Sequence, residues 1–290
     1  MNTIHQLSQY ARQELKDTYN PQEIQSICRI VFLDVLQYTK IDIHIRKNEI
    51  LDESFVDKFF EIVRLLKNGH PLQYIIGETE FAGLKFRLDH STLIPRPETE
   101  ELVRLVKERL TAGKKVLDIG TGSGCIAISL AAACPGAKIT GIDISPEAVE
   151  MARANAARNG VEAEFLIRDI LHFETEEWPA YDFIVSNPPY VRECEKRDMQ
   201  RQVLDHEPPR ALFVPDSDPL LFYRRIAEFG CRYLLPGGTL YVEINEALGK
   251  ETAALLEKYD YRQVKIRKDL FGKDRFVTAQ ADSPGKNNDR

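Results

Sequence analysis

Apolar residues recur every three or four positions through the first 70 residues of the chain, which is the spacing of amphipathic helices. Asn20 followed by Pro21 is typical of a helix start, and Glu23 is placed to complete a capping box. Ser54 is predicted to open a further helix, which the Asn-Gly-His-Pro run at 68–71 ends. The predicted buried stripes are Ile4, Leu7, Ala11 and Leu15, then Ile24, Ile27, Cys28, Val31, Val35 and Tyr38, then Phe55, Phe59, Ile62, Val63 and Leu66.

Residues 1–70 are therefore predicted to form a small helical domain that serves as a cap or docks a partner. The next segment, 71–96, has a different character, because the runs 74–77 and 81–86 are short, apolar and rich in glycine. That pattern predicts a β-hairpin that links two domains.

From residue 115 apolar runs alternate with helical segments. The predicted strands are Val116–Ile119, Lys138–Ile142, Ala163–Ile167, Phe183–Val185 and Leu240–Ile244, and the helices between them include Ser123–Ala133, Pro146–Asn159 and Pro219–Leu234. This alternation predicts an α/β domain over residues 97–280, with a parallel sheet covered by helices on both faces. A last strand pair is predicted at 262–266 and 275–279, followed by a polar tail at 281–290 that is expected to be disordered.

Composition narrows the class of protein. Hydrophobic residues make up 43% of the chain and no run approaches the roughly 18 apolar residues of a membrane helix, so no membrane span and no secretory signal are expected. The net charge of −6 argues against a protein whose main task is to bind a nucleic-acid backbone. Five scattered cysteines without a Cys-x-x-Cys pair argue against disulfides and a cysteine zinc site. We expect no bound metal. We expect the protein to be a monomer in the cytoplasm.

Polar residues and glycines follow four of the predicted strands, at the point where each strand ends. They are the glycine loop 120–124, Asp143, Asp169, and the Asn-Pro-Pro-Tyr run at 187–190. Because ligands of open parallel sheets bind outside the carboxyl ends of the strands, we expect these four exits to converge on one site.

The glycine loop indicates which ligand this site takes. Gly120, Gly122 and Gly124 allow close backbone approach, with Thr121 and Ser123 between them, and Cys125 stands where a dinucleotide fingerprint needs glycine. The Gly-x-Gly-x-Gly spacing after Asp118 resembles the first motif of S-adenosylmethionine-dependent methyltransferases. A strand-end carboxylate at Asp143 is expected to accept the ribose hydroxyls. Asp169 is expected to accept the adenine amino group, and Ile170 to pack on the adenine ring.

The Asn187–Tyr190 run is the most specific signal in the chain. Pro188 and Pro189 cannot continue a central strand, and they fix the backbone around them. The Asn187 side chain and the Pro188 carbonyl can then accept the two N–H groups of a planar –NH2, and Tyr190 supplies a flat face for stacking. Asn187, Pro188 and Tyr190 are therefore the predicted catalytic residues. Such a site aims a poorly nucleophilic amide or amino nitrogen at an electrophilic carbon.

These motifs together resemble the HemK/PrmC family, the protein-(glutamine-N5) methyltransferases of peptide-chain release factors. The similarity rests on VLDIGTGSG, VSNPPY, Leu93–Glu100, the HEPPRAL segment at 206–212 and the stretch Asp269–Arg275. The resemblance implies a Rossmann-like methyltransferase sheet with a small helical domain that docks the substrate. It also implies S-adenosylmethionine bound at 120–124, Asp143, Asp169, Ile170 and Asn187, and a substrate glutamine, in the Gly-Gly-Gln motif of class I release factors, held by residues 187–190.

Other functions stay open on the residues alone. An adenine-N6 or guanine-N2 methyltransferase of nucleic acid would use the same Asn-Pro-Pro-Tyr chemistry on a flipped base. A non-catalytic module that senses the cofactor is a third alternative, although it would not need the acceptors of Asn187 and Pro188. The sequence assigns no role to Arg96, Thr99 or Arg275, and it leaves His206 and Glu207 as either a substrate gate or a solvated loop. Cys125 is expected to be a packing residue.

Overall fold

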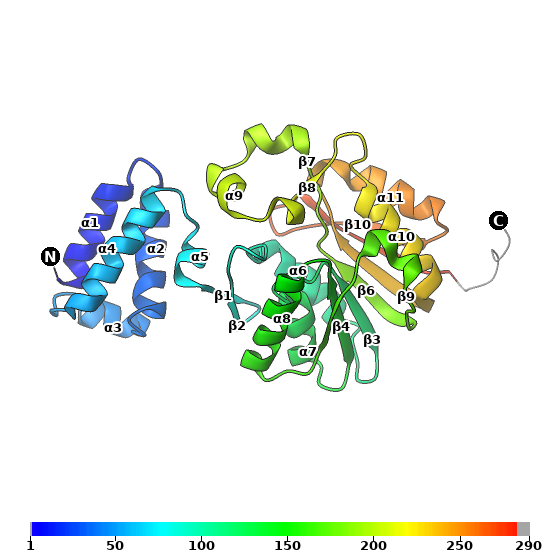
Figure 1. Cartoon of the computed structure of the whole chain (residues 1–290), viewed down its shortest axis with the longest axis horizontal. Helices are drawn as coiled ribbons and strands as arrows, with labels where there is room; N and C mark the ends of the chain where they lie inside the picture. Colours follow the sequence, from blue (N-terminus) through cyan, green and yellow to red (C-terminus); the bar gives the residue numbers. More distant parts are fainter. Residues whose placement is uncertain (1, 283–290) are drawn as a thin grey trace. The chain divides into compact units, whose positions relative to one another are not determined.

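The structure is a computed structural model that describes residues 2–282, and it divides into two compact units (Figure 1). Among the described residues, one unit holds 2–78 together with Gln200–His206, and the other holds Thr79–Met199 together with 207–282. The predicted domain limits at residues 70, 96 and 280 stay a prediction. Most of the predicted disordered tail, 283–290, lies outside the described residues. Ala281, at its start, donates a hydrogen bond to the Gly238 carbonyl.

The first unit is helical. Its helices are α1 (Ile4–Leu15), α2 (Pro21–Asp34), α3 (Lys40–Ile45), α4 (Glu53–Lys67), α5 (Leu72–Ile76) and α9 (Arg201–His206). The predicted capping box is present, since the Asn20 side chain accepts from the Glu23 N–H and the Glu23 carboxylate accepts from the Asn20 N–H. The predicted apolar stripes of α1, α2 and α4 supply most of the buried core of this unit.

Two local predictions in this unit were wrong, and one helix was missed. The cap of α4 is Asp52 rather than Ser54, because the Asp52 carboxylate accepts from the Ser54 N–H and the helix starts one residue later. Helix α3 was not predicted, because it has only six residues and none is buried. Residues 74–76 belong to helix α5 rather than to a strand, and the hairpin is made by β1 (Glu78–Phe81) and β2 (Leu84–Arg87).

The second unit contains a seven-stranded sheet of order β10-β11-β9-β6-β3-β4-β5 (Figure 1). Its strands are β3 (Lys115–Ile119), β4 (Lys138–Asp143), β5 (Glu164–Ile167), β6 (Tyr181–Ser186), β9 (Leu234–Glu243), β10 (Arg262–Lys268) and β11 (Asp274–Gln280). The five strands from β9 to β5 are parallel, as predicted, while β11 runs antiparallel to β9 and β10 antiparallel to β11. A further pair, β7 (Val191–Arg192) and β8 (Phe213–Val214), stands apart from this sheet.

Helices bury both faces of the sheet, as the alternating pattern predicted. The helices of this unit are α6 (Pro97–Lys107), α7 (Cys125–Ala133), α8 (Pro146–Asn159), α10 (Leu221–Tyr233) and α11 (Gly249–Lys258), with short 3-10 turns at Ile170–Thr175, Glu193–Asp198, Pro209–Ala211 and Glu246–Leu248. Helices α6, α7 and α8 share one hydrophobic core with one face of the sheet, and α10 and α11 share a second core with the other. The chain therefore has the predicted α/β fold.

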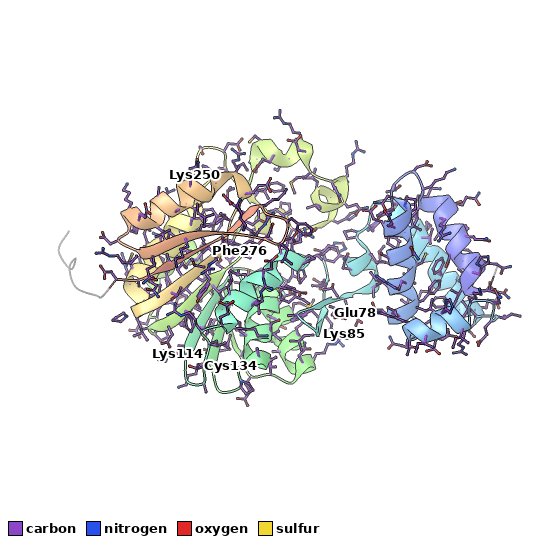
Figure 2. All side chains as sticks on the ribbon, turned by 180° about the vertical axis from the view of Figure 1, so that it is seen from behind. Glu78, Lys85, Lys114, Cys134, Lys250 and Phe276 are labelled. Carbon is purple, nitrogen blue, oxygen red and sulfur yellow. The ribbon has the colours of Figure 1, made fainter. Side chains whose placement is uncertain are left out.

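Two edges of this sheet differ in chemistry. Lys114 precedes β3 and Cys134 follows α7, and both lie at the amino edge of the parallel strands (Figure 2). The residues predicted to carry the chemistry follow the carboxyl ends of the same strands, at the opposite edge. No helix within residues 2–282 is long and apolar enough to cross a membrane. The same residues contain no cluster of three or more His, Cys, Asp or Glu side chains arranged to hold a metal ion.

Candidate active site

The glycine loop leaves β3 with its backbone facing open space. Gly120 and Gly122 have φ values of +72° and +54°, and a Cβ atom added to either would meet no atom within 4 Å. At Gly124, which has a φ of +81°, a Cβ atom would lie 2.8 Å from the Ile128 side chain. The first two glycines therefore allow a ligand to approach the backbone, whereas the third lets α7 pack against its neighbours.

Asp118 lies directly beneath this loop and is fully buried. Its Oδ2 accepts from the Thr121 hydroxyl at 2.7 Å and from the Ala127 N–H at 3.2 Å. Its Oδ1 is buried and has no hydrogen-bond partner among the residues that the structure describes. Burial raises the pKa of Asp118 to about 7. An unpaired buried oxygen beside an open glycine loop is suited to a ligand that brings a hydrogen-bond donor.

Asp143 joins the exits of β3 and β4. Its Oδ2 accepts from the Gly122 N–H at 2.9 Å, and its Oδ1 accepts from the Ser145 N–H at 3.0 Å. Burial raises the pKa of Asp143, and these N–H bonds oppose the rise. Ser145 caps α8 through a bond from the Ala148 N–H. The structure therefore places Asp143 and the glycine loop together, with carboxylate lone pairs left to accept further donors.

The exit of β5 adds the next two predicted residues. The Arg168 N–H donates to the Asp143 carbonyl at 2.9 Å, which ties this exit to that of β4. The Asp169 carboxylate accepts from the Leu171 N–H at 2.8 Å and lies 2.7 Å from His172 Nδ1. Ile170 is only 7% exposed and belongs to the sheet core. Little of its surface is available to a ring, and its predicted packing role stays a prediction.

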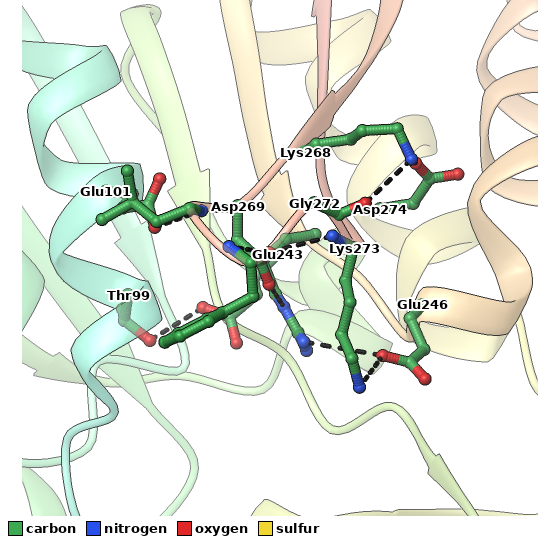
Figure 3. Close-up of polar contacts among 12 residues, drawn as sticks. Thr99, Glu101, Glu243, Glu246, Lys268, Asp269, Gly272, Lys273 and Asp274 are labelled. Atoms are coloured by element: carbon green, nitrogen blue, oxygen red, sulfur yellow. Dashed lines mark hydrogen bonds and ion pairs between the residues drawn. The ribbon is translucent and has the colours of Figure 1, made fainter.

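The Asn187 amide is oriented by a chain of hydrogen bonds. Asn187 Nδ2 donates to Thr99 Oγ1 at 3.1 Å. The Thr99 hydroxyl donates in turn to Glu243 Oε2 at 2.7 Å, a bond that Figure 3 shows. Because a hydroxyl has one hydrogen and Thr99 uses it toward the ionised form of Glu243, its oxygen can then only accept from Asn187. The amide is thereby held with its –NH2 group toward Thr99, which leaves Asn187 Oδ1 as an acceptor on the other side.

The rest of the diproline segment is held from neighbouring strands. Ser186 donates its hydroxyl to the Ile119 carbonyl at 2.7 Å, and Asn245 Nδ2 donates to the Tyr190 carbonyl at 3.1 Å. Within residues 2–282 no donor is hydrogen-bonded to the Pro188 carbonyl oxygen. The Tyr190 hydroxyl donates to Glu243 Oε1 at 3.1 Å, and burial raises the pKa of Tyr190, so the phenol stays protonated.

Thr99 and Glu243 are the residues that the sequence analysis did not assign. Glu243 is 1% exposed and accepts from both Thr99 and Tyr190. It ends β9, a fifth strand exit, and it stands as the acid in the otherwise apolar run Leu-Tyr-Val-Glu-Ile at 240–244. An acid within an apolar strand was the signal that could have identified Glu243. It was missed because the sequence analysis considered only the four other strand ends. Thr99 gave no comparable signal in the polar run at 98–101.

The remaining unassigned residues form ion pairs or ring contacts. Glu207 is 3% exposed and accepts from Arg96 Nη2 at 2.7 Å, so it is not part of a solvated loop. His206 belongs to the helical unit, where its ring lies 4.2 Å from that of His70. Arg275 donates its Nε–H to Asp269 Oδ2 at 3.0 Å. Cys125 packs against the core, and burial raises the pKa of its thiol to about 12, which agrees with a packing role.

Glu243 predicts a pH dependence of stability. Burial raises its pKa from 4.5 to about 7, against the hydrogen bonds from Thr99 and Tyr190 and the nearby charge of Arg275. Because the folded protein holds this proton more tightly than the unfolded chain, the stabilisation is complete below pH 4.5 and is lost as the pH rises through about 7. Relative to Glu243→Gln, the wild-type protein should lose about 3 kcal/mol of unfolding free energy across this window.

Urea unfolding of both proteins, at a pH near 5 and at a pH near 8, measures this difference. Asp118 titrates in the same window but is present in both proteins, so the difference isolates Glu243. Parallel pH profiles for the two proteins would contradict the raised pKa.

Comparison with known proteins agrees with the fold and the site. The family profile "Methyltransferase small domain" matches residues 97–212, and "PrmC N-terminal domain" matches residues 6–77. The sheet is similar to that of a Thermus thermophilus 16S rRNA N2 G1207 methyltransferase, solved with AdoMet and guanosine, with a TM-score of 0.51 and 20% identity. That likeness covers 70% of this chain and 49% of that one, and it bears on the fold alone. The chain is an enzyme of the S-adenosylmethionine-dependent methyltransferase class.

Two curated relatives define the family more narrowly. The release factor glutamine methyltransferase of Bacteroides thetaiotaomicron is 45% identical over 276 residues, which covers 95% of this chain and 99% of that protein. The one of Flavobacterium psychrophilum is 45% identical over 270 residues, covering 91% of this chain and 94% of that protein. The chain therefore belongs to the release factor glutamine methyltransferase family.

The residues at the carboxyl edge fit S-adenosylmethionine, the cofactor of this class. A Cβ atom at Gly120 or Gly122 would meet nothing within 4 Å, so a ligand can approach the backbone there, and the unpaired Asp118 Oδ1 is suited to a donor group. The Asp143 carboxylate is placed beside the loop to accept hydroxyl groups. The side chains around this glycine-lined surface are thus rich in hydrogen-bond acceptors, as a positively charged ligand with a ribose requires.

Proposed function

We propose that this enzyme transfers a methyl group from S-adenosylmethionine to the side-chain nitrogen (N5) of the glutamine in the Gly-Gly-Gln motif of class I peptide-chain release factors. The observation that carries the proposal is the chain of hydrogen bonds from Asn187 through Thr99 to Glu243. These bonds fix an asparagine amide, which could otherwise point either its oxygen or its –NH2 group at the substrate, as a hydrogen-bond acceptor. Family membership supports the substrate, because the relatives are named release factor glutamine methyltransferases.

In this proposal the diproline segment binds the glutamine side chain. Asn187 Oδ1 and the Pro188 carbonyl accept the two N–H groups of its terminal amide, and Pro189 fixes the backbone between Pro188 and Tyr190. The Tyr190 ring packs against the plane of the amide. Two acceptors increase the electron density on the nitrogen and hold its lone pair toward the glycine loop. The hydrogen-bond chain gives this arrangement in advance, so little free energy is lost in ordering it.

Most of the proposed cofactor residues follow β3, β4 and β5, on one side of the diproline segment that follows β6. Residues 120–124, Asp143, Asp169, Ile170 and Asn187 would hold S-adenosylmethionine. S-adenosylmethionine supplies a methyl group on a positively charged sulfur, which leaves as a neutral thioether. The amide nitrogen gives up one proton to solvent after methylation, so no strong base is required. Glu243 is already used by two hydroxyl donors and is assigned a positioning role.

The proposal extends to partners and location. The helical unit is assigned to docking of the release factor, and the enzyme is expected to act as a monomer without direct binding of nucleic acid. The net charge of −6 supports the last point. All five cysteines are free thiols, which fits the reducing cytoplasm.

Mass spectrometry of a purified class I release factor tests the proposal. After incubation with enzyme and isotope-labelled S-adenosylmethionine, the peptide that contains Gly-Gly-Gln should gain one labelled methyl group on the glutamine. A release factor with Gly-Gly-Glu in place of Gly-Gly-Gln is the matched control and should stay unlabelled. Parallel reactions on RNA and DNA test the adenine-N6 and guanine-N2 alternative. Label in nucleic acid and none in the release factor would overturn the proposed function.

A further inference from the structure

The turn between β10 and β11 exposes two large apolar side chains. Leu270 is 78% exposed and Phe271 is 79% exposed, the two highest values among the large hydrophobic residues of the described chain. They are neighbours in sequence, so they form one apolar tip rather than scattered exposed positions. We call Leu270 and Phe271 the turn tip. Contiguous exposed apolar surface on a folded protein indicates a place where another molecule binds.

The turn that carries this tip is held rigidly from inside. The Asp269 side chain is buried, and its Oδ1 accepts from the N–H groups of Phe271 at 2.9 Å and Lys273 at 3.0 Å. Its Oδ2 accepts from Arg275 Nε at 3.0 Å. The Gly272 N–H donates to the Asp269 carbonyl at 2.9 Å (Figure 3). A turn with this many internal bonds presents its tip in one conformation, which lowers the entropy lost on binding.

The sheet topology places the turn tip at the same edge as the proposed acceptor site. Strand β11 runs antiparallel to β9, and Phe276 of β11 pairs with Glu243 of β9. The turn just before β11 therefore lies next to the carboxyl end of β9. The Leu270 N–H donates to Glu101 Oε1 at 3.1 Å, and Glu101 is on α6, the helix that also carries Thr99 (Figure 3).

The strand order also fixes what lies on each side of the acceptor site. The proposed cofactor residues follow β3, β4 and β5, the acceptor residues follow β6 and β9, and the turn tip joins β10 and β11. Along the sheet edge the acceptor site thus stands between the cofactor half and the turn tip. A polypeptide whose glutamine reaches the acceptor site can continue over the turn tip without crossing the cofactor half.

The charges around the tip favour an apolar contact. Lys268 is paired with Asp274 at 2.9 Å, and Lys273 is paired with Glu246 at 2.8 Å (Figure 3). Both cations that flank the tip are therefore paired with acids of this chain. What the turn offers to a partner is then mainly the apolar surface of the two side chains.

We propose that Leu270 and Phe271 bind apolar side chains of the protein substrate next to its acceptor glutamine. This proposal rests on the proposed function, because it assigns a second contact to the same substrate. It commits to the polypeptide substrate as the occupant, because the turn tip follows the acceptor strands along the same sheet edge and is bonded to α6, which carries Thr99. The turn tip then contributes to recognition of the substrate and not to the chemical step.

The double variant Leu270→Ser/Phe271→Ser tests the proposal with the full-length enzyme and an intact release factor. KM for the release factor should rise by about tenfold or more, as expected when two large apolar contact residues of an interface are removed. The kcat value should stay within about twofold, because neither residue touches the reacting atoms. Cofactor affinity by calorimetry should not change.

Leu235→Ser is the matched control. Leu235 is also exposed, at 38%, but it lies at the amino end of β9, the opposite end from Glu243. This control should leave KM and kcat unchanged. Phe271→Leu alone keeps the apolar surface and should retain most of the affinity for the release factor. The thermal unfolding midpoint of each variant checks that the fold is intact, which is expected because the substituted side chains are exposed.

An unchanged KM for the release factor in the double variant, with the wild-type enzyme active, overturns the role of the turn tip and leaves the proposed function standing. Absence of methylation by the wild-type enzyme overturns the proposed function itself. Sedimentation velocity adds a further outcome. If the wild-type protein self-associates, the double variant does not, and KM is unchanged, the turn tip is a contact between copies of this chain and the proposal is wrong.

Discussion

Replacing Asn187 with alanine should reduce kcat on the release factor by on the order of 10²–10³-fold while cofactor affinity stays within about twofold. The side chain removed is the one that the Thr99 hydroxyl fixes with its oxygen outward. Without it the substrate nitrogen keeps one acceptor and loses its alignment. Single-turnover methylation with saturating enzyme measures the effect on the chemical step, and calorimetry with S-adenosylmethionine measures binding. Equal single-turnover rates would refute the acceptor role.

Asn159→Ala is the matched control for this substitution. Asn159 ends α8 and donates to the carbonyls of Lys85 and Asn155, so it makes hydrogen bonds of the same kind. Helix α8 starts beside the glycine loop, and its last residue therefore lies at the far end from the site. The control should retain full activity, with at most about 1–3 kcal/mol lost from stability.

Thr99→Val separates the orientation of the amide from its presence. Valine keeps the volume of threonine but removes the hydroxyl that joins Asn187 to Glu243. The amide is then free to turn, and kcat should fall by about tenfold with KM for the cofactor unchanged. A wild-type kcat in this variant would show that Asn187 is oriented by something else.

Replacing Asp143 with alanine should weaken S-adenosylmethionine binding by about 1–3 kcal/mol, or roughly 5- to 150-fold in Kd. Two effects contribute to this loss. The carboxylate that is proposed to accept the ribose hydroxyls disappears, and the Gly122 and Ser145 N–H groups lose their common acceptor. Calorimetric titration with S-adenosylmethionine, and with its demethylated product, gives the affinity directly.

Asp182→Ala controls for the loss of a strand-end carboxylate. Asp182 lies near the start of β6, where it accepts from the Lys115 N–H at 2.9 Å and from Lys114 Nζ at 2.7 Å. It has the same kind of bonds at the opposite edge of the sheet. Cofactor affinity should be unchanged in this variant. An equal loss of affinity in both variants would mean that Asp143 acts only by holding the fold.

The accuracy of the predictions made from the sequence differs from one helix or strand to the next. The predicted helix at Pro146–Asn159 has the same limits as α8, because Ser145, Pro146 and Gly160 mark its two ends. Residues 74–76 were wrongly predicted to form a strand, because three consecutive apolar residues fit a strand or a helix equally well. There the left-handed cap at Gly77, with a φ of +80°, closes a short helix instead.

The sequence by itself determined the alternation of strands and helices, the family, and the side chains that follow four strand ends. These signals are local, since caps, periodicity and turn residues act over a few positions along the chain. Only the tertiary structure decided that Asn187 is held by Thr99, 88 positions earlier, and Thr99 by Glu243, 144 positions later. It also placed the Leu270–Phe271 turn beside that site through the antiparallel pairing of β9 and β11. Such contacts depend on strand order and register, which no short segment of sequence specifies.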